Sequence, residues 1–245
     1  MNNKNDRLDK NPGKNKLALL GIPHDANSSH MKGTAAAPPL IRDAFNCYSS
    51  NKWSESGIDL GAEDIFFDAG DVQLKNVPGD EDFPAIEKAV EQLLENHLPP
   101  ISLGGDHAIS LPVIKAILRR YEKIDILHFD AHPDLYDSFE DNPFSHACPF
   151  ARVMESGQVN RLVQVGIRTL HAHQRRQAER FAVEMIEMRH FSGMKPLEFT
   201  GPLYISFDLD ALDPAFAPGV SHLEPGGLST TSTFGRELRL GSSMP

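Results

Sequence analysis

Apolar positions along the chain form short runs that alternate with segments of helical period. The runs are four to eight residues long and are bounded by Gly, Pro or Asp, which is typical of buried strands. Seven such strands are predicted, at residues 16–23, 65–71, 99–105, 124–130, 161–168, 183–188 and 203–208.

Helical segments are predicted between several of these strands. After Asp82, the apolar residues Phe83, Ile86 and Val90 lie on one helical face, and we expect Asp82 to cap that helix. Ser110 is expected to cap the next helix, and residues 149–155 and 174–181 also have helical patterns. Strands that alternate with helices indicate a parallel sheet covered on both faces. We therefore expect one α/β domain, a three-layer α/β/α structure with a mostly parallel sheet, over residues 17–229.

Composition and charge narrow the classes of function. Apolar residues make up 40% of the 245 residues and charged residues 24%, which fits a globular protein. The formal net charge of −10 argues against sequence-independent binding to nucleic acid, which requires a basic surface. The net negative charge is compatible with a cationic small molecule as substrate. No stretch approaches the roughly 18 apolar residues of a membrane span, so we expect no membrane partner.

The N-terminal residues and the cysteines bear on the compartment. Residues 1–16 are mostly Asn, Lys and Asp and lack the apolar region of a secretory signal, so a disordered tail is expected there. The two cysteines, Cys47 and Cys148, cannot form a disulfide framework, as expected in a reducing cytosol. The sequence therefore predicts a cytoplasmic protein.

Candidate chemistry lies where three predicted strands end. Each strand is followed by Asp residues, and the first two also by His, in Gly104-Gly-Asp-His107, Asp130-Ala-His-Pro-Asp134 and Ser206-Phe-Asp-Leu-Asp210. Parallel sheets bind ligands beyond the carboxyl ends of their strands. Residues at i, i+2 and i+4 of an extended chain project to one face. These segments are therefore expected to bring two imidazoles and four carboxylates together.

Such a cluster needs cations, because unpaired buried charge costs several kcal/mol per ion. Two divalent ions neutralise four carboxylates, and ligation by oxygen with some imidazole favours Mn²⁺ over Zn²⁺ or Cu²⁺. Two adjacent metals ionise a shared water near neutral pH. The residues alone therefore indicate metal-assisted hydrolysis, with a guanidinium, an amine or a metal-bound phosphate all left open as substrate.

The three motifs resemble those of the ureohydrolase family, which comprises arginase, agmatinase and their relatives. The resemblance covers about residues 17–229, and residues 144–155 and 219–229 are most similar to plant-type arginases and agmatinase-like bacterial proteins. It implies an arginase-like fold and hydrolysis of a guanidino compound, agmatine or arginine, to urea and an amine. It also implies a small cationic substrate and a homo-oligomer.

The resemblance also implies roles for single residues. His146 matches the proton-shuttle histidine, and His222 lies in a loop near the substrate entrance, where it would contact the substrate. Two Mn²⁺ ions are implied. His107 and Asp134 would contact only the first ion, and His132 and Asp210 only the second. The carboxylates of Asp130 and Asp208 would bridge the two ions.

The last residues depart from the family pattern. After Gly226-Gly-Leu-Ser229 the family continues with a variable residue, an Arg and an acid, whereas this chain has Thr231 and Ser232 at the last two places. The family then has a helix, a last strand and a closing helix. We therefore expect residues 230–245 to form an aberrant or truncated tail, and the fold to lack the last strand and helices.

Two other functions stay open. The first is a catalytically silent metal-binding fragment of such an enzyme, which would bind manganese without releasing urea. The second is a metal-dependent deacetylase with a related α/β architecture, although six ligands for two metals weigh against its usual single Zn²⁺.

Overall fold

The computed structural model describes residues 17–62, 65–193 and 196–231. The two predicted tails lie outside these residues, apart from residues 230 and 231. The chain divides into two compact units, Met1–Asn27 with Lys32–Ile117 and Ser28–Met31 with Leu118–Pro245. Whether residues 17–229 form one domain stays a prediction, and the units are described in turn.

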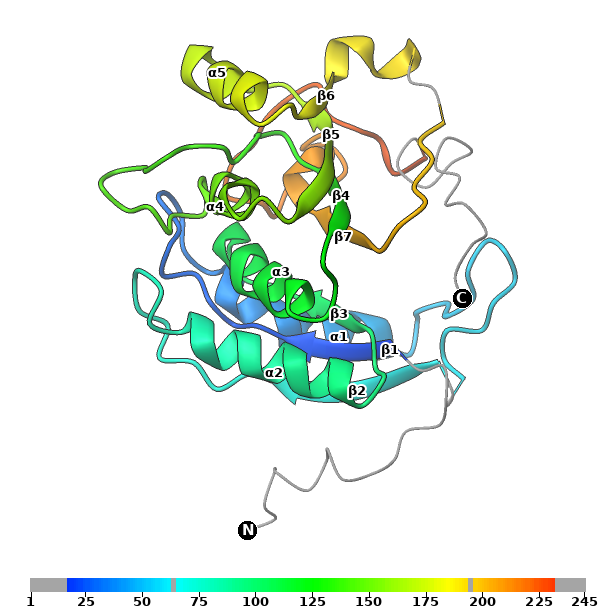
Figure 1. Cartoon of the computed structure of the whole chain (residues 1–245). Helices are drawn as coiled ribbons and strands as arrows, with labels where there is room; N and C mark the ends of the chain where they lie inside the picture. Colours follow the sequence, from blue (N-terminus) through cyan, green and yellow to red (C-terminus); the bar gives the residue numbers. More distant parts are fainter. Residues whose placement is uncertain (1–16, 63–64, 194–195, 232–245) are drawn as a thin grey trace. The chain divides into compact units, whose positions relative to one another are not determined.

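The first unit has a three-stranded parallel sheet of order β2-β1-β3 (Figure 1). Its strands are β1 (Leu17–Gly21), β2 (Phe66–Asp71) and β3 (Pro100–Leu103). Buried apolar side chains of β1, such as Ala18 and Leu20, place this strand in the core. The three strands confirm the first three predicted from the apolar runs.

Three α-helices pack in the first unit, α1 (Ala37–Asn46), α2 (Phe83–Glu95) and α3 (Ser110–Leu118). Figure 1 shows α1 on one side of the sheet and α2 on the other. Helix α1 was not predicted from the sequence. Its apolar residues Leu40, Ile41, Ala44 and Phe45 do have helical spacing, but the segment opens with Pro38 and Pro39, a pair that is also typical of a loop. Asp82 precedes α2 as expected but does not cap it. Its carboxylate instead accepts hydrogen bonds from the backbone of residues 75–77, whose N–H groups lie within 3.3 Å.

A fully buried histidine lies between two acids of the first unit. His24 Nδ1 is 3.6 Å from Asp106 Oδ2, and Nε2 is 3.7 Å from Asp82 Oδ2. Burial by itself lowers the pKa of His24, but the two carboxylates, Asp106 above all, outweigh it and raise that pKa above its ordinary value of 6.5.

We expect this ion pair to make stability depend on pH. A raised folded-state pKa stabilises the protein fully below pH 6.5, and the contribution is lost as the pH rises through the folded-state value. His24→Gln should therefore lose more free energy of unfolding at pH 6 than at pH 9, measured by urea denaturation at both values. An equal loss at the two pH values would contradict a charged His24.

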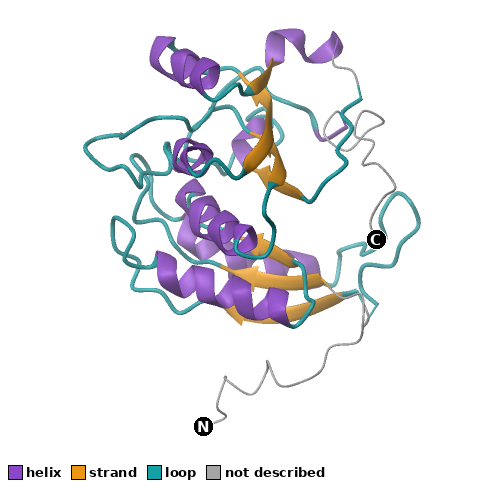
Figure 2. Cartoon of the chain, viewed as in Figure 1, coloured by secondary structure: helices purple, strands orange, loops and turns teal. Residues whose placement is uncertain are grey.

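The second unit has a four-stranded parallel sheet of order β6-β5-β4-β7. Its strands, β4 (Ile124–Phe129), β5 (Val159–Ile167), β6 (Glu184–Glu187) and β7 (Leu203–Phe207), confirm the last four predicted strands. A long loop joins β4 to α4 (Pro149–Glu155), and α5 (Ala172–Arg180) follows β5 (Figure 2). All six residues of β4 are buried, as expected for an inner strand of a parallel sheet covered on both faces.

Both helices of this unit confirm the predicted segments within two residues. Apolar side chains such as Leu127, Val163 and Leu212 form the core on one side of the sheet. His128 and Phe150 are buried as well and stack on each other. In the described part of the chain, no helix has the length and apolar content that crossing a membrane requires. Cys47 and Cys148 are both free thiols, in line with the expected absence of disulfides.

Candidate metal centre

The residues that follow β4 and β7 come together at the carboxyl ends of these strands. Because β4 and β7 are parallel neighbours paired from Asp125 with Leu203 to Phe129 with Phe207, both chains leave the sheet at the same edge. There the backbone N–H of Ala131 donates to Asp210 Oδ1 at 3.1 Å. Strand pairing therefore brings together acids that are far apart in the sequence.

The first group of ligand atoms comes from both strand ends. One side-chain atom each of Asp130, His132 and Asp210 lies within 4.8 Å of the other two. His132 Nδ1 is 3.1 Å from Asp210 Oδ2 and 3.4 Å from Asp130 Oδ1. Asp208 accepts a hydrogen bond of 2.9 Å from the backbone N–H of Asp210, but it belongs to neither group of ligand atoms among the described residues, so its part in the metal site stays a prediction.

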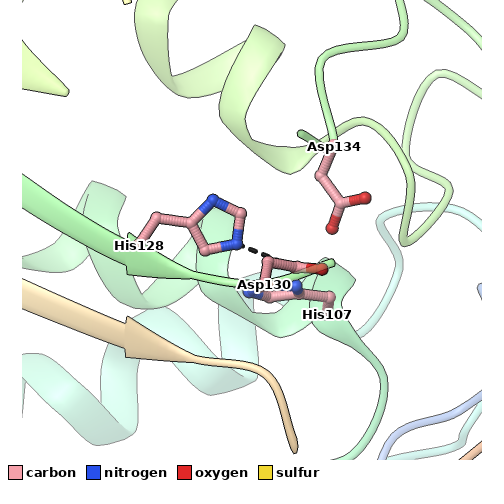
Figure 3. A group of neighbouring side chains, drawn as sticks. All are labelled: His107, His128, Asp130 and Asp134. Atoms are coloured by element: carbon pink, nitrogen blue, oxygen red, sulfur yellow. Dashed lines mark hydrogen bonds and ion pairs between the residues drawn. The ribbon is translucent and has the colours of Figure 1, made fainter. Parts of the chain in front are cut away.

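A second group lies on the other side of Asp130. Ligand atoms of His128, Asp130 and Asp134 lie within 4.8 Å of one another (Figure 3). Asp130 belongs to both groups, which is the position that a bridging carboxylate requires. His107 begins a short 3₁₀ helix (His107–Ile109) in the first unit. Its part in the metal site stays a prediction.

The clustered carboxylates of this centre favour a bound cation. Burial, followed by the negative charges of Asp130 and Asp208, raises the pKa of Asp210 to about 8. Burial lowers the pKa of His132, but the carboxylates of Asp130 and Asp210 outweigh it and raise that pKa to about 12. Oxygen donors with imidazole nitrogen suit Mn²⁺ among the divalent ions. The donor set therefore fits the predicted manganese.

Two predicted site histidines lie beside each other in the second unit. His146 stacks on His222 with ring centroids 5.6 Å apart and an interplanar angle of 27°. His146 Nε2 is 2.8 Å from Ser29 Oγ. The centroid of His222 also lies 5.4 Å from the rings of His132 and His30. Burial first, then the nearby His132 and His30, lowers the pKa of His222 below its ordinary value. The ring of His222 thus lies beside both His146 and His132, a candidate metal ligand.

Hydrogen bonds to its backbone hold the loop that carries Asp210. The guanidinium of Arg168 donates to the carbonyl oxygens of Asp210 and Glu224, both at 2.6 Å from Nη2. Residues 226–228 lie against residues 211–213, with Leu228 N–H donating to Ala211 O and Asp213 N–H donating to Leu228 O, each at 2.9 Å. This contact leaves no room for a side chain at Gly227.

We expect Gly227→Ala to destabilise the protein. A Cβ atom there would lie 2.5 Å from Asp213 N and 2.8 Å from Ala211 O, which are backbone atoms that cannot yield. Overpacking of this kind costs about 1–3 kcal/mol or more in the free energy of unfolding, measured by urea denaturation. Gly219→Ala is the matched control, since a Cβ there meets nothing within 4 Å. Equal stability of the two variants would contradict the tight contact.

Two residues of the centre were not predicted from the sequence. His128 carried a signal, because it is two residues before Asp130 on the same strand face and so belongs to the series of residues 128, 130, 132 and 134. Glu224 carried no such signal in the sequence. It lies in a loop 92 positions after His132 in the sequence (224 − 132), and only folding brings its Oε1 to 3.5 Å from His132 Nε2.

Comparisons with known proteins show which proteins this chain is similar to. The family model described as "Arginase family" matches residues 15–235. Arginase 1 of Arabidopsis thaliana, named as mitochondrial, is 47% identical over 226 residues, 86% of this chain and 66% of that protein. An agmatinase of Bacillus cereus is 32% identical, over 88% of this chain and 74% of its own length. The solved arginase of Medicago truncatula superposes with a TM-score of 0.89 at 40% identity, covering 94% of this chain and 79% of that one. The chain thus spans just under two thirds of the Arabidopsis relative.

Proposed function

Because the chain belongs to the arginase family, we propose that it hydrolyses a guanidino compound to urea and an amine with two Mn²⁺ ions. The relatives are named arginases and agmatinases, which supports this reaction. The observation that carries the proposal is the position of Asp130, whose carboxylate belongs to two neighbouring groups of ligand atoms.

The six predicted ligands have separate tasks in this proposal. Bound together, two Mn²⁺ ions would supply the Lewis acidity that ionises a water near neutral pH. Asp130 and Asp208 would contact both ions, and each of the other four ligands would contact one. His107 and Asp134 would contact only the first ion, and His132 and Asp210 would contact only the second ion.

His146 and His222 act on the organic substrate in this proposal. Histidine is the side chain most often used in general acid–base catalysis, and His146 would deliver a proton to the leaving amine. The hydroxyl of Ser29, at 2.8 Å, holds the His146 ring at Nε2. His222 stacks on that ring and would contact the substrate beside it. The acidic centre attracts a cationic guanidinium.

The substrate, the assembly and the compartment are further parts of the proposal. Arginine is the first compound to test, since the arginases are 45–48% identical to this chain and the agmatinases 31–32%. Agmatine is the second. We propose a homo-oligomer, as the resemblance implies. A cytoplasmic location stays a prediction, because several plant relatives are named as mitochondrial.

The test is a urea assay on the full chain, loaded with Mn²⁺ and compared with chelator-treated protein. Arginine, agmatine and a set of other guanidino compounds would each be supplied. Manganese-dependent urea release from one of them is the expected result. Manganese binding without urea release from any compound would indicate a silent metal-binding protein, and no manganese binding would contradict the metal centre.

A further inference from the structure

His128 is a buried polar side chain that the proposed reaction does not use. It lies on β4, has no exposed surface, and its ring stacks on Phe150 of α4 with centroids 4.0 Å apart. A polar group that is buried in this way must find hydrogen-bond partners, because an unsatisfied one costs about 1–3 kcal/mol. Both ring nitrogens therefore deserve an account.

The two ring nitrogens of His128 face different partners. Nε2 is 2.8 Å from Asp130 Oδ2 (Figure 3), and Nδ1 is 3.0 Å from the amide nitrogen of Gln164. Gln164 is the residue of β5 that pairs with His128 across the sheet, and it is fully buried as well. Sheet register therefore places the amide beside the ring.

A third contact determines where the proton of the ring lies. The same Gln164 amide nitrogen donates to the carbonyl oxygen of Pro133 at 2.7 Å. That carbonyl can only accept, so the amide nitrogen, and not the amide oxygen, must face it. One N–H then goes to Pro133 and the other to His128 Nδ1, which must accept. The ring proton is left on Nε2, where it is donated to Asp130.

The opposite orientation of Gln164 is unfavourable. It would place two oxygen atoms 2.7 Å apart at Pro133 and turn the NH₂ group to the side where the amide oxygen now has no hydrogen-bond partner among the described residues. Both changes lose hydrogen bonds in a buried place. The contacts of Gln164 thus select one tautomer of His128.

We propose that His128 is a positioning residue for the bridging carboxylate of Asp130, and that Gln164 holds it in the Nε2–H tautomer. The backbone N–H of His132 donates to Asp130 Oδ1 at 2.6 Å, and His128 donates to Oδ2. With a donor at each oxygen, the carboxylate plane is held in one orientation. Groups that orient metal ligands in this way commonly change metal affinity by about 10–100-fold.

The same contacts argue against His128 as a metal ligand, although its ring lies within 4.8 Å of Asp130 and Asp134. To offer Nε2 to a metal, the ring would have to move its proton to Nδ1. That proton would then face the N–H of Gln164, donor against donor. His128 therefore acts through Asp130.

The proposal rests on the proposed manganese centre for one of its two tests. His128→Phe keeps the aromatic stack and removes the donor, and we expect it to bind Mn²⁺ about 10–100-fold more weakly, by calorimetry, with two ions still bound at saturation. His128→Gln offers an N–H near the place of Nε2 and should restore most of the affinity. Phe150→Leu is the matched control, because it weakens the stack and leaves the hydrogen bond.

Three outcomes of the manganese titrations would overturn the proposal. They are unchanged affinity in His128→Phe, loss of one ion from the stoichiometry, as expected of a ligand, and an equal loss of affinity in Phe150→Leu. Urea release is not measured here, so a silent protein does not affect the result.

The second test needs no metal, and its result is taken from the wild-type protein, with one variant used only to assign the resonance. Nitrogen-15 NMR of the metal-free wild-type protein distinguishes the two imidazole tautomers, and the proton of His128 is expected on Nε2. Gln164→Met, which removes the donor to Nδ1, assigns the resonance through the shift that it causes. A proton on Nδ1 of His128 in the wild-type protein would overturn the proposal, whether or not the chain binds manganese.

Discussion

We expect Asp130→Ala to bind neither of the two Mn²⁺ ions. Its carboxylate is common to both groups of ligand atoms, so its removal takes a ligand from each ion at once. The manganese content, measured by elemental analysis after dialysis, should fall from two ions per chain to none. Urea release should fall to the level of chelator-treated protein.

Two further variants make this result specific. Asp134→Ala should weaken mainly one ion, because Asp134 belongs to one group only. Asp141→Asn is the control, since Asp141 is an exposed acid of the same unit and Asn tolerates its φ of 61°. Two tightly held ions in Asp130→Ala would show that this carboxylate does not bridge. Asp208→Ala should repeat the loss of both ions.

His146→Asn is expected to lower turnover by about 10²–10⁴-fold, the usual contribution of general acid–base catalysis, with the manganese content unchanged. His146 lies beside His222 and contacts Ser29, and it belongs to neither group of metal-ligand atoms. Its loss therefore affects proton transfer and leaves the metal in place. Steady-state urea assays and elemental analysis on the same preparation test both parts.

His173→Asn is the matched control for His146. His173 is in the same unit, on α5, where it stacks on Tyr136, and it belongs to neither group of ligand atoms. It should keep full turnover. Unchanged turnover in His146→Asn would mean that this histidine has no part in the reaction, and a lower manganese content would mean that it supports the metal centre instead.

Local sequence pattern was enough to predict the strands and most of the helices. The near-continuous apolar residues of β4 and β5 are a signal that neighbouring residues carry by themselves, and both strands lie within two residues of their predicted bounds. Helix α1 was missed although its apolar residues have helical spacing. Its two prolines, Pro38 and Pro39, are typical of a loop, but in the structure they lie in the first turn, where a helix tolerates proline.

The positions of the candidate ligands were also predicted from local rules. Alternation along an extended chain puts Asp130 and His132 on one face, and the rule that ligands lie beyond the carboxyl ends of strands directs them to one edge. The structure brings Asp130, His132 and Asp210 together there. The prediction that Asp82 caps a helix was wrong. A loop that no local pattern describes brings three N–H groups to its carboxylate.

The sequence by itself determined which segments are strands and which side chains follow them, because both depend on neighbouring residues. Only the tertiary structure decided which distant groups meet. Gln164 reaches His128 from 36 residues away through the register of β4 with β5, and Glu224 reaches His132 through a loop. Strand order and register arise from packing of the whole sheet, where a shift of one residue would turn Gln164 to the opposite face. The tautomer of His128, and with it the orientation of Asp130, is therefore a property of the folded sheet.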